Sequence, residues 1–363
     1  MHQAGKNKNF PLRVMFELTY RCNFHCKHCY VPEDYRKYGE LKTKEVFLIL
    51  DQLADIGCFY LGFTGGEPFM RKDILEILWY AKKSGFEIII YTNGSLIDQK
   101  IARQLSLLRL NKVDITIPGL SQKVFESISG VAGSRDKVFN AINSLHKENI
   151  NLGFKSCVLK QNKNEISQIQ KFAHSFAAAH RLDDMLMPSL DGSKEPFKCR
   201  GTLIKNLKLS DRLLAKGHMR RTLDCTTQNP YVVDAKQLPI NQIANAQTLF
   251  KCGVGVNQAV ITPQGELKMC LMIDSPKYEI LSRKTSQRPS LEDAWKKLKE
   301  FVVSIKPDKN YACNKCKFQP YCKWCPARGW LYNKEFTACE PESRCRAQAE
   351  YKNAVLKNKL IAI

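Results

Sequence analysis

The chain has 363 residues, of which 44% are hydrophobic and 25% carry a charge, and its formal net charge is +22 at pH 7. This composition supports a sizeable core and about two or three domains. No stretch of about 20 apolar residues is present, which excludes a membrane-spanning helix, and the basic N-terminus lacks the apolar segment of a secretory signal. We therefore expect a cytoplasmic protein whose 15 cysteines serve as metal ligands rather than as disulfide partners.

Segments typical of strands and of helices alternate from residue 12 to about residue 190. Near-continuous apolar runs such as Ile88-Ile89-Ile90-Tyr91 are typical of parallel strands that are buried on both faces. The expected strands are 12–18, 59–63, 87–91, 113–117, 152–159 and 185–187. Apolar residues at helical spacing predict helices near 43–56, 74–81, 98–108, 135–146 and 165–178. Six strand–helix units predict an α/β fold, a partial (β/α)6 barrel, with an open doubly wound sheet as the alternative.

Two further regions come after the predicted barrel. Residues 191–250 lack a clear period and are interpreted as a bridging segment with one or two helices. Basic residues concentrate at 194–221, which indicates either a solvated surface or a contact with an acidic partner or RNA. The chain is rich in cysteine and short loops from residue 251 onward, which predicts a small metal-stapled domain. The predicted domains are therefore 1–190, 191–250 and 251–363.

Three cysteines, Cys22, Cys26 and Cys29, follow the first expected strand with the spacing C-x3-C-x2-C. A zinc site needs four ligands, usually in two separate pairs, although His25 and His28 lie inside this loop as further donors. An iron–sulfur cube held by three cysteines instead keeps one iron open for a small molecule. The spacing therefore favours an iron–sulfur cluster over zinc.

A second motif, Thr64-Gly65-Gly66-Glu67-Pro68, follows the second expected strand. Its two glycines let the backbone approach a ligand closely, although such a run also occurs as an ordinary strand–helix turn. Thr92-Asn93-Gly94 and Thr116-Ile117-Pro118-Gly119 follow the third and fourth strands. The run Thr92-Asn93-Gly94 is equally compatible with an ordinary turn.

The cysteine run and the Gly-Gly-Glu-Pro run together resemble those of the radical S-adenosylmethionine (SAM) enzymes. The resemblance implies that Cys22, Cys26 and Cys29 hold a [4Fe-4S] cluster that binds and cleaves SAM. It further implies that the amino group of the methionine moiety of SAM contacts the run Thr64, Gly65, Gly66, Glu67 and Pro68. His28 would lie near the adenine and Asn93 beside the ribose, and Thr116 is expected to contact SAM as well. This chain departs from the family at Pro118 and at 128–130, where many relatives carry an acidic residue or tyrosine and an arginine. The resemblance therefore supplies no partner for the SAM carboxylate on this side.

A second cysteine array begins at Cys252, and a hairpin is expected at 263–267, before Cys270. The array resembles the SPASM extension of radical SAM enzymes, which carries auxiliary iron–sulfur clusters. One departure is the interval between Cys322 and Cys325, which has two residues where the family usually has three. A single zinc in a ribbon is the alternative. The resemblance implies one auxiliary cluster, expected as [4Fe-4S], on Cys252, Cys270 and Cys325, with an open iron or a distant donor such as Cys225. It implies a second auxiliary cluster on Cys313, Cys316, Cys322 and Cys345. Cys345 is preferred to Cys339 as the fourth ligand of this cluster.

The other cysteines, Cys58, Cys157, Cys199, Cys225 and Cys339, are expected to be small buried hydrophobes, with a hydrogen-atom donor to a substrate radical as the alternative for one of them.

The resemblance implies an oxidative enzyme that cleaves SAM reductively to a 5′-deoxyadenosyl radical and takes hydrogen from a peptide or protein. The product would be a crosslink, a thioether or a similar modification, with the auxiliary clusters as electron acceptors. The expected partners are an acidic peptide and a flavodoxin- or ferredoxin-type electron donor. Because the first strand starts near residue 12, no peptide-recognition domain is expected ahead of the barrel. The peptide would then need a separate recognition protein, or the barrel and the bridging segment would bind it alone. The alternatives are modification of a small molecule such as a tetrapyrrole and, outside enzymes, a zinc-containing RNA-binding protein.

Overall fold

The structure is a computed structural model that describes residues 10–200, 249–250, 252–281, 290–307, 311–322 and 324–361. Its centre is one sheet of nine strands in the order β6-β5-β4-β3-β2-β1-β7-β8-β9. Every neighbouring pair from β6 to β7 is parallel, and the pairs β7–β8 and β8–β9 are antiparallel. Within these residues, no helix has the length and hydropathy needed to cross a membrane.

The strands agree with most of the sequence prediction. They are β1 (Arg13–Thr19), β2 (Tyr60–Gly65), β3 (Glu87–Thr92), β4 (Lys112–Thr116), β5 (Leu152–Cys157), β6 (Ala179–Asp183), β7 (Gln258–Ile261), β8 (Glu266–Cys270) and β9 (Ile273–Glu279). The first five predicted strands and the hairpin after residue 262 are confirmed. The strand predicted at 185–187 is wrong, because β6 lies at 179–183. In β6, polar residues that face the inside of the barrel alternate with residues that face the outer helices. Leu186 packs instead in a small separate cluster with Ile128 and Leu159.

The helices include four that the sequence did not predict. They are α1 (Thr43–Asp55), α2 (Ile74–Lys83), α3 (Gln99–Leu107), α4 (Gln122–Ser129), α5 (Ser134–Lys147), α6 (Ile166–Ser175), α8 (Leu291–Ser304), α9 (Pro326–Asn333) and α10 (Pro341–Ile361). The five predicted helices are confirmed, and α4, α8, α9 and α10 were missed. In α4, Ser121 caps the amino end by accepting a hydrogen bond from Val124, and Gly130 ends the helix in the left-handed conformation.

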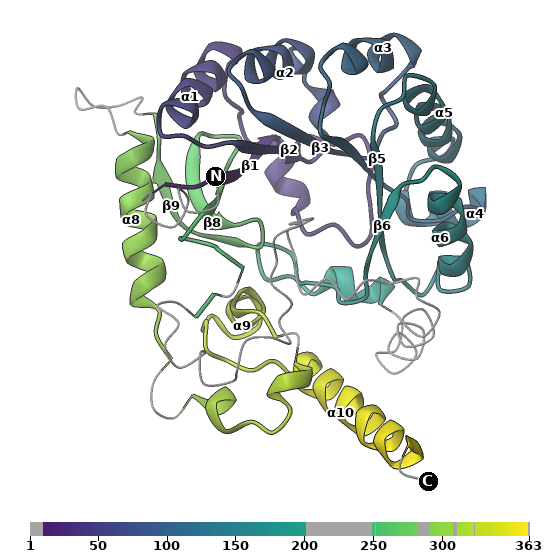
Figure 1. Cartoon of the computed structure of the whole chain (residues 1–363), viewed down its shortest axis with the longest axis vertical. Coiled ribbons are helices and arrows are strands. Elements are labelled where there is room, and N and C mark those ends of the chain that lie inside the picture. Colours follow the sequence, from purple (N-terminus) through teal and green to yellow (C-terminus); the bar gives the residue numbers. More distant parts are fainter. Residues whose placement is uncertain are drawn as a thin grey trace.

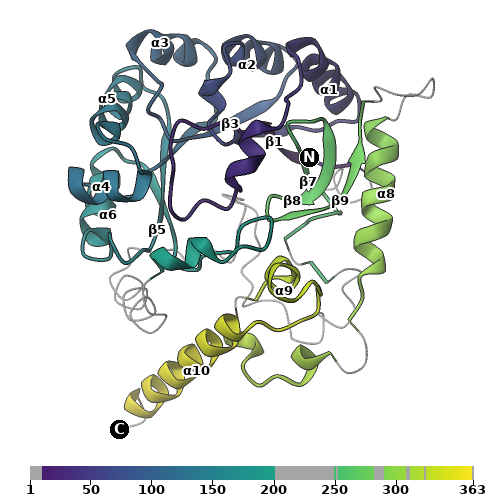
Figure 2. The same cartoon turned by 180° about the vertical axis from the view of Figure 1, so that it is seen from behind.

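Helices α1 to α6 line the outer face of the curved sheet, as both views of the molecule show (Figures 1 and 2). Strands β7 to β9 extend the sheet beyond β1, with α8 beside them, and α10 projects away from the body (Figure 1). An open doubly wound sheet would carry helices on both faces, so the partial barrel is the correct interpretation. The predicted boundary at residue 251 stays a prediction, and the sheet itself continues across it through the pairing of β7 with β1.

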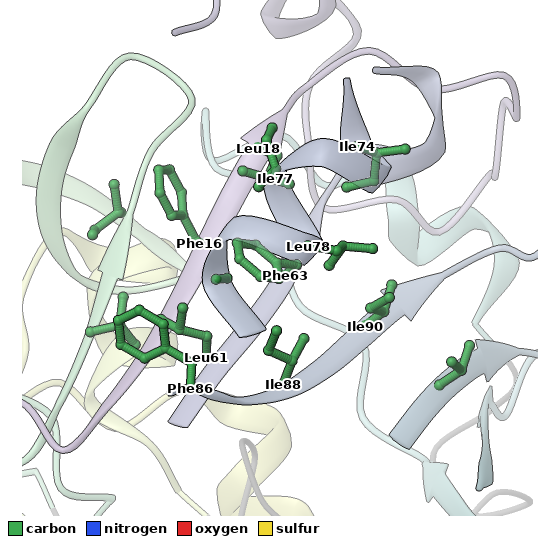
Figure 3. Close-up of a cluster of buried hydrophobic side chains, with 14 of the residues drawn as sticks. Phe16, Leu18, Leu61, Phe63, Ile74, Ile77, Leu78, Phe86, Ile88 and Ile90 are labelled. Atoms are coloured by element: carbon green, nitrogen blue, oxygen red, sulfur yellow. The ribbon is translucent and has the colours of Figure 1, made fainter. Parts of the chain in front are cut away.

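The main core lies between the sheet and the outer helices. Ile74, Ile77, Leu78 and Ala81 of α2 are buried at helical spacing. Figure 3 shows this stripe packed over the buried side chains of β1 to β3. Burial of each such large aliphatic side chain contributes about 1.5–3 kcal/mol, so the packing of α2 on this face stabilises the barrel.

The other face of the sheet, which we call the lumen, carries a different set of side chains. A Cβ atom on Gly62 would collide with the sulfur of Met15, and one on Gly153 would lie 2.8 Å from Cδ of Lys112. Side chains of β1 and β4 therefore project inward over these two glycines. Residues two apart on a strand share a face, so the lumen side of β4 to β6 also carries Asp114, Lys155, Arg181 and Asp183.

Candidate functional site

The cysteine loop lies at the carboxyl end of β1. The backbone N–H groups of His25 and Lys27 donate to the carbonyl oxygens of Ser129 and Ile128, at 2.8 and 3.2 Å. A Cβ atom on Gly130 would lie 2.8 Å from the carbonyl oxygen of His25. The carboxyl end of α4 therefore fixes the loop, and its close approach requires a glycine at residue 130.

The three thiols of this loop share one environment. Burial raises the pKa of Cys22 to about 11, and it also raises the pKa of Cys26 and of Cys29. The nearby thiolates of Cys29 and Cys22 raise the pKa of Cys26 further, while Arg36 lowers it. The backbone N–H of Phe24 lies 3.4 Å from the sulfur of Cys22 and donates to it. The loop therefore gathers three sulfur donors beside one cation.

The donor geometry distinguishes a cluster from a single ion. Among the described residues, no three His, Cys, Asp or Glu side chains are close enough to hold one metal ion. Ligands of a single zinc must converge to about 2.0–2.3 Å from it. A cube presents its irons at separate corners, so that each thiolate binds a different iron. The three neighbouring thiols are therefore compatible with a cube in which each of them binds a different iron.

The Gly-Gly-Glu-Pro turn lies directly against the start of this loop. Gly66 N–H donates to the carbonyl of Thr19 at 2.7 Å, and Glu67 N–H donates to that of Arg21 at 2.9 Å. Gly65 has a φ of +143°, and a Cβ atom on either glycine would collide with a backbone oxygen of this segment. Both glycines are thus required by the close contact between the turn and the chain that leads into the loop.

The carboxylate of Glu67 is hydrogen-bonded within the protein. It is fully buried and accepts hydrogen bonds from the backbone N–H of Phe69 at 3.1 Å and of Asn93 at 2.6 Å, and from the hydroxyl of Thr92 at 2.7 Å. These bonds join the turn after β2 to the turn after β3. Any contact of this motif with an amino group would therefore come from the backbone of the turn rather than from this carboxylate.

The turn after β3 also faces the cysteine loop. The side-chain amide of Asn93 donates to Asn23 at 2.9 Å and lies 4.0 Å from the sulfur of Cys22. The amide of Asn23 donates in turn to Ser95 at 2.8 Å. The structure thus brings together the cysteine loop, residues 64–68 and Asn93.

His28 and Thr116 lie toward β5, next to Lys155. Burial and the neighbouring charge of Lys155 lower the pKa of His28 to about 4, so the ring is neutral at pH 7. Its Nδ1 atom is buried and makes no hydrogen bond among the described residues. Thr116 ends β4 and is the register partner of Lys155. The register of β3 and β4 places Thr116 next to the turn at Asn93, because Thr92 pairs with Ile115.

The second cysteine array divides into two groups. Cys252, Cys270 and Cys325 are half-buried and pack against the main core. In the other group, burial raises the pKa of Cys322 to about 11. The charges of Cys313, Cys339 and Cys316 raise this pKa further. The charge of Cys339 thus acts on this group, and Cys339 and Cys345 are both exposed. The choice of Cys345 over Cys339 as a ligand stays a prediction, and Cys339 is not the buried hydrophobe that the sequence predicted.

The remaining cysteines have mixed surroundings. Cys58 and Cys199 are buried, as expected for small hydrophobes, and Cys157 is half-buried at the end of β5. Cys225 and most of the basic segment 194–221 lie outside the described residues.

The sequence interpretation missed the charged side chains of the lumen. The available signal was the alternation of charged and apolar residues in Lys112-Val113-Asp114-Ile115 and in Arg181-Leu182-Asp183. It also missed a buried pair, Glu17 and Lys268, whose side chains are 2.9 Å apart and fully buried. A charged residue within an otherwise apolar strand was the signal in both cases.

The first testable change is Gly66→Ala. The added methyl group would meet backbone oxygens of Tyr20 and Arg21, which cannot rotate away as a flexible side chain would. We expect this variant to lose SAM binding by at least about tenfold, because the turn and the cysteine loop must separate. Equilibrium binding of SAM to the reconstituted protein measures the effect. Gly39→Ala is the matched control, since no atom lies within 4 Å of its added carbon, and equal affinities in the two variants would contradict the expectation.

The second change, Glu67→Gln, has a pH signature. Burial raises the pKa of Glu67 to about 7 from 4.5, although hydrogen bonds from Asn93, Thr92 and Phe69 oppose the shift. The folded protein therefore binds this proton more tightly than the unfolded chain does. Its stabilising contribution is fully present below the unfolded pKa and is lost as pH rises through 7. We expect the free energy of unfolding to fall by about 1 kcal/mol between pH 6 and pH 8 on this account. Urea unfolding at both pH values should show this difference in the wild type, and its persistence in Glu67→Gln would assign it to another group.

Comparison with known proteins adds a family to this geometry. Residues 16–173 match the Radical SAM superfamily model. The Fe-coproporphyrin III synthase of Methanosarcina barkeri is 34% identical over 168 residues, which cover 46% of this chain and 41% of that protein. The mycofactocin maturase MftC of Mycobacterium tuberculosis is 27% identical over 326 residues, or 89% of this chain and 80% of the maturase. The first similarity thus spans less than half of that relative, and the second extends into the cysteine-rich region.

The fold is also shared with a solved structure. Streptococcus suis SuiB bound to the precursor peptide SuiA superimposes with a TM-score of 0.66 at 16% identity, covering 92% of this chain and 76% of SuiB. With this coverage, the superposition extends from the barrel into the cysteine-rich region. Given the match over residues 16–173 and the cysteine loop at the carboxyl end of β1, the chain is an enzyme with a radical SAM domain at residues 16–173 and a cysteine-rich region after its barrel.

Proposed function

We propose that this enzyme uses SAM to modify a peptide or protein oxidatively. The observation that carries the proposal is the convergence of the cysteine loop, the Gly-Gly-Glu-Pro turn and Asn93 at one end of the barrel. The radical SAM domain implies SAM and one [4Fe-4S] cluster. When bound, this pair supplies a 5′-deoxyadenosyl radical that takes a hydrogen atom from the substrate.

The residues of the site have separate roles in this proposal. Cys22, Cys26 and Cys29 would hold the cluster, with Phe24 N–H donating to one sulfur. The backbone of the turn at 64–68 would bind the amino group of SAM, because the carboxylate of Glu67 is already bonded within the protein. Asn93 would lie beside the ribose, His28 beside the adenine and Thr116 beside the methionine moiety. The surrounding barrel would exclude water from the reacting atoms.

The second cysteine array would hold auxiliary iron–sulfur clusters that accept the electron released by substrate oxidation. Cys252, Cys270 and Cys325 would hold one of them. Cys313, Cys316 and Cys322 would hold the other, with Cys345 as the fourth ligand or, because its charge acts on Cys322, Cys339 in its place. We also propose that the region from 251 onward acts as the auxiliary-cluster domain and that residues 191–250 bridge it to the barrel. The reducing electron would come from a flavodoxin- or ferredoxin-type protein.

A peptide substrate is supported by relatives that extend over most of the chain. The relative that aligns over 89% of this chain is named a maturase, and the solved neighbour holds a precursor peptide. A separate recognition protein would then present the peptide to the barrel. Modification of a tetrapyrrole is the second candidate, favoured only by the similarity of 46% of this chain to an Fe-coproporphyrin III synthase.

The test is a comparison of substrates with the anaerobically reconstituted enzyme, SAM and dithionite. Short peptides encoded next to this gene and an iron porphyrin precursor are supplied separately, and 5′-deoxyadenosine, the mass of each substrate and any iron coproporphyrin III formed are measured. A peptide that loses two hydrogens in step with 5′-deoxyadenosine release supports the proposal. Conversion of the porphyrin alone would assign the enzyme to the second candidate.

A further inference from the structure

Three charged residues line adjacent strands on one side of the lumen. Thr116 of β4, Lys155 of β5 and Arg181 of β6 are successive register partners across the sheet. Asp183, two residues after Arg181 on the same face, lies 3.2 Å from Nζ of Lys155 and 3.9 Å from Nε of Arg181. One carboxylate is thus shared between two cations at the carboxyl end of these strands.

The charge balance of this wall is positive. Although burial by itself raises the pKa of Asp183, the charges of Lys155 and Arg181 hold it below its usual range. Asp183 is therefore ionised at neutral pH. Deeper in the lumen, Lys112 and Asp114 form a separate ion pair at 2.6 Å. Together the wall holds three cations, Lys112, Lys155 and Arg181, and two carboxylates, which leaves one positive charge without a counterion among these five residues.

Hydrogen-bonding capacity also remains unused at this place. Nε of Arg181 is buried and donates no hydrogen bond among the described residues. The side chains of Arg181 and Lys155 keep 22% and 34% of their surface accessible, on the lumen face of the sheet. A buried donor without an acceptor is uncommon in proteins, so this Nε atom is available to donate to a bound group or to water. The planar guanidinium fork matches a carboxylate, which accepts two parallel hydrogen bonds.

The wall is close to the cysteine loop. Lys155 is near enough to His28 to lower the pKa of that ring. Cys157, on the same strand face as Lys155, is near enough to Cys26 to raise the pKa of its thiol. The segment 128–130, where many relatives carry an arginine, has no basic side chain and uses its backbone to hold the loop instead. Lys155 and Arg181 are therefore two cations of the barrel wall beside the site, in addition to Arg36 at the cysteine loop.

We propose that Arg181 and Lys155 form a carboxylate-binding site in the lumen. The carboxylate belongs either to the methionine part of SAM or to the substrate, so the inference rests on the proposed function for its ligand. In the first case the pair replaces the cation missing at 128–130. In the second case the substrate presents an acidic side chain or a chain terminus next to the C–H bond that reacts.

The test measures binding rather than turnover, so its outcome is separate from the fate of the proposed function. The reconstituted wild type, Arg181→Gln and Lys155→Gln are titrated anaerobically with SAM and with decarboxylated SAM. Arg103→Gln, on the exposed face of α3, is the matched control. If the carboxylate is that of SAM, both lumen variants weaken SAM binding by about tenfold or more and leave decarboxylated SAM unchanged. Circular dichroism monitors the folding of each variant, and the use of two variants keeps the test decisive if one of them folds poorly.

The second arm addresses the substrate. Arg181 of the SAM-loaded wild type is modified with phenylglyoxal, with and without glutarate as a small carboxylate probe, and the modified peptide is quantified by mass spectrometry. If the substrate supplies the carboxylate, SAM affinity is unchanged in both variants and glutarate slows modification of Arg181 severalfold, but not that of Arg103. Unchanged SAM affinity together with no protection by glutarate would overturn the proposal.

Discussion

Replacing Cys22, Cys26 and Cys29 together by alanine is expected to remove about four iron atoms per chain after anaerobic reconstitution, from about 12 in the wild type. The loop gathers these three thiols beside Arg36 and against the turn at 64–68, and each would bind a different iron of one cube. The same variant is expected to release no 5′-deoxyadenosine from SAM, because no open iron remains to bind it. Iron and acid-labile sulfide are measured together with 5′-deoxyadenosine.

The matched control is Cys58→Ala. Cys58 is buried beside β1 and β2, where its thiol donates weakly to the carbonyl oxygens of Leu12 and Tyr60. We expect this variant to keep its full iron content, since a buried thiol of this kind acts as a small hydrophobe. Zinc without sulfide in the wild type, or an unchanged iron content in the triple variant, would refute the cluster assignment.

The second large effect is expected at Arg328. This side chain is only 2% exposed and lies on α9, beyond the cysteine-dense run. Its Nε donates to Glu340 at 2.6 Å and its Nη2 donates to Glu342 at 2.8 Å. Its Nη1 donates to the carbonyl of Leu186, at 3.0 Å, in the segment after β6. One guanidinium thus joins the C-terminal region to the end of the barrel.

Arg328→Ala is expected to lower the free energy of unfolding by about 3–5 kcal/mol, because it leaves the fully buried carboxylate of Glu340 without its counterion. Denaturant unfolding of the reconstituted protein measures this change. Arg344→Ala on the exposed face of α10 is the control and should stay within about 0.5 kcal/mol of the wild type. The double variant Arg328→Ala/Glu340→Gln should recover part of the loss, and no recovery would show that the effect comes from packing rather than from charge.

The fold was predictable from the sequence where one physical pattern dominated. Strands β1 to β5 are apolar segments packed under helices, so their hydrophobic pattern predicted them within a few residues. The sixth strand was misplaced because Arg181 and Asp183 face a polar lumen, which removes the apolar signal. The short helix α4 was missed because its stability depends on its caps and on packing rather than on a long apolar stripe.

The candidate site divides in the same way. The sequence by itself determined the three thiols, the two glycines and the order of the turns, because each depends on a residue type at a fixed spacing along one segment. Only the tertiary structure decided that Glu67 bonds to the next turn, that the charge of Cys339 acts on Cys322, and that Lys155, Arg181 and Asp183 meet in the lumen. These depend on strand register and on contacts between distant segments, and hydrogen bonding and charge act through space rather than along the chain.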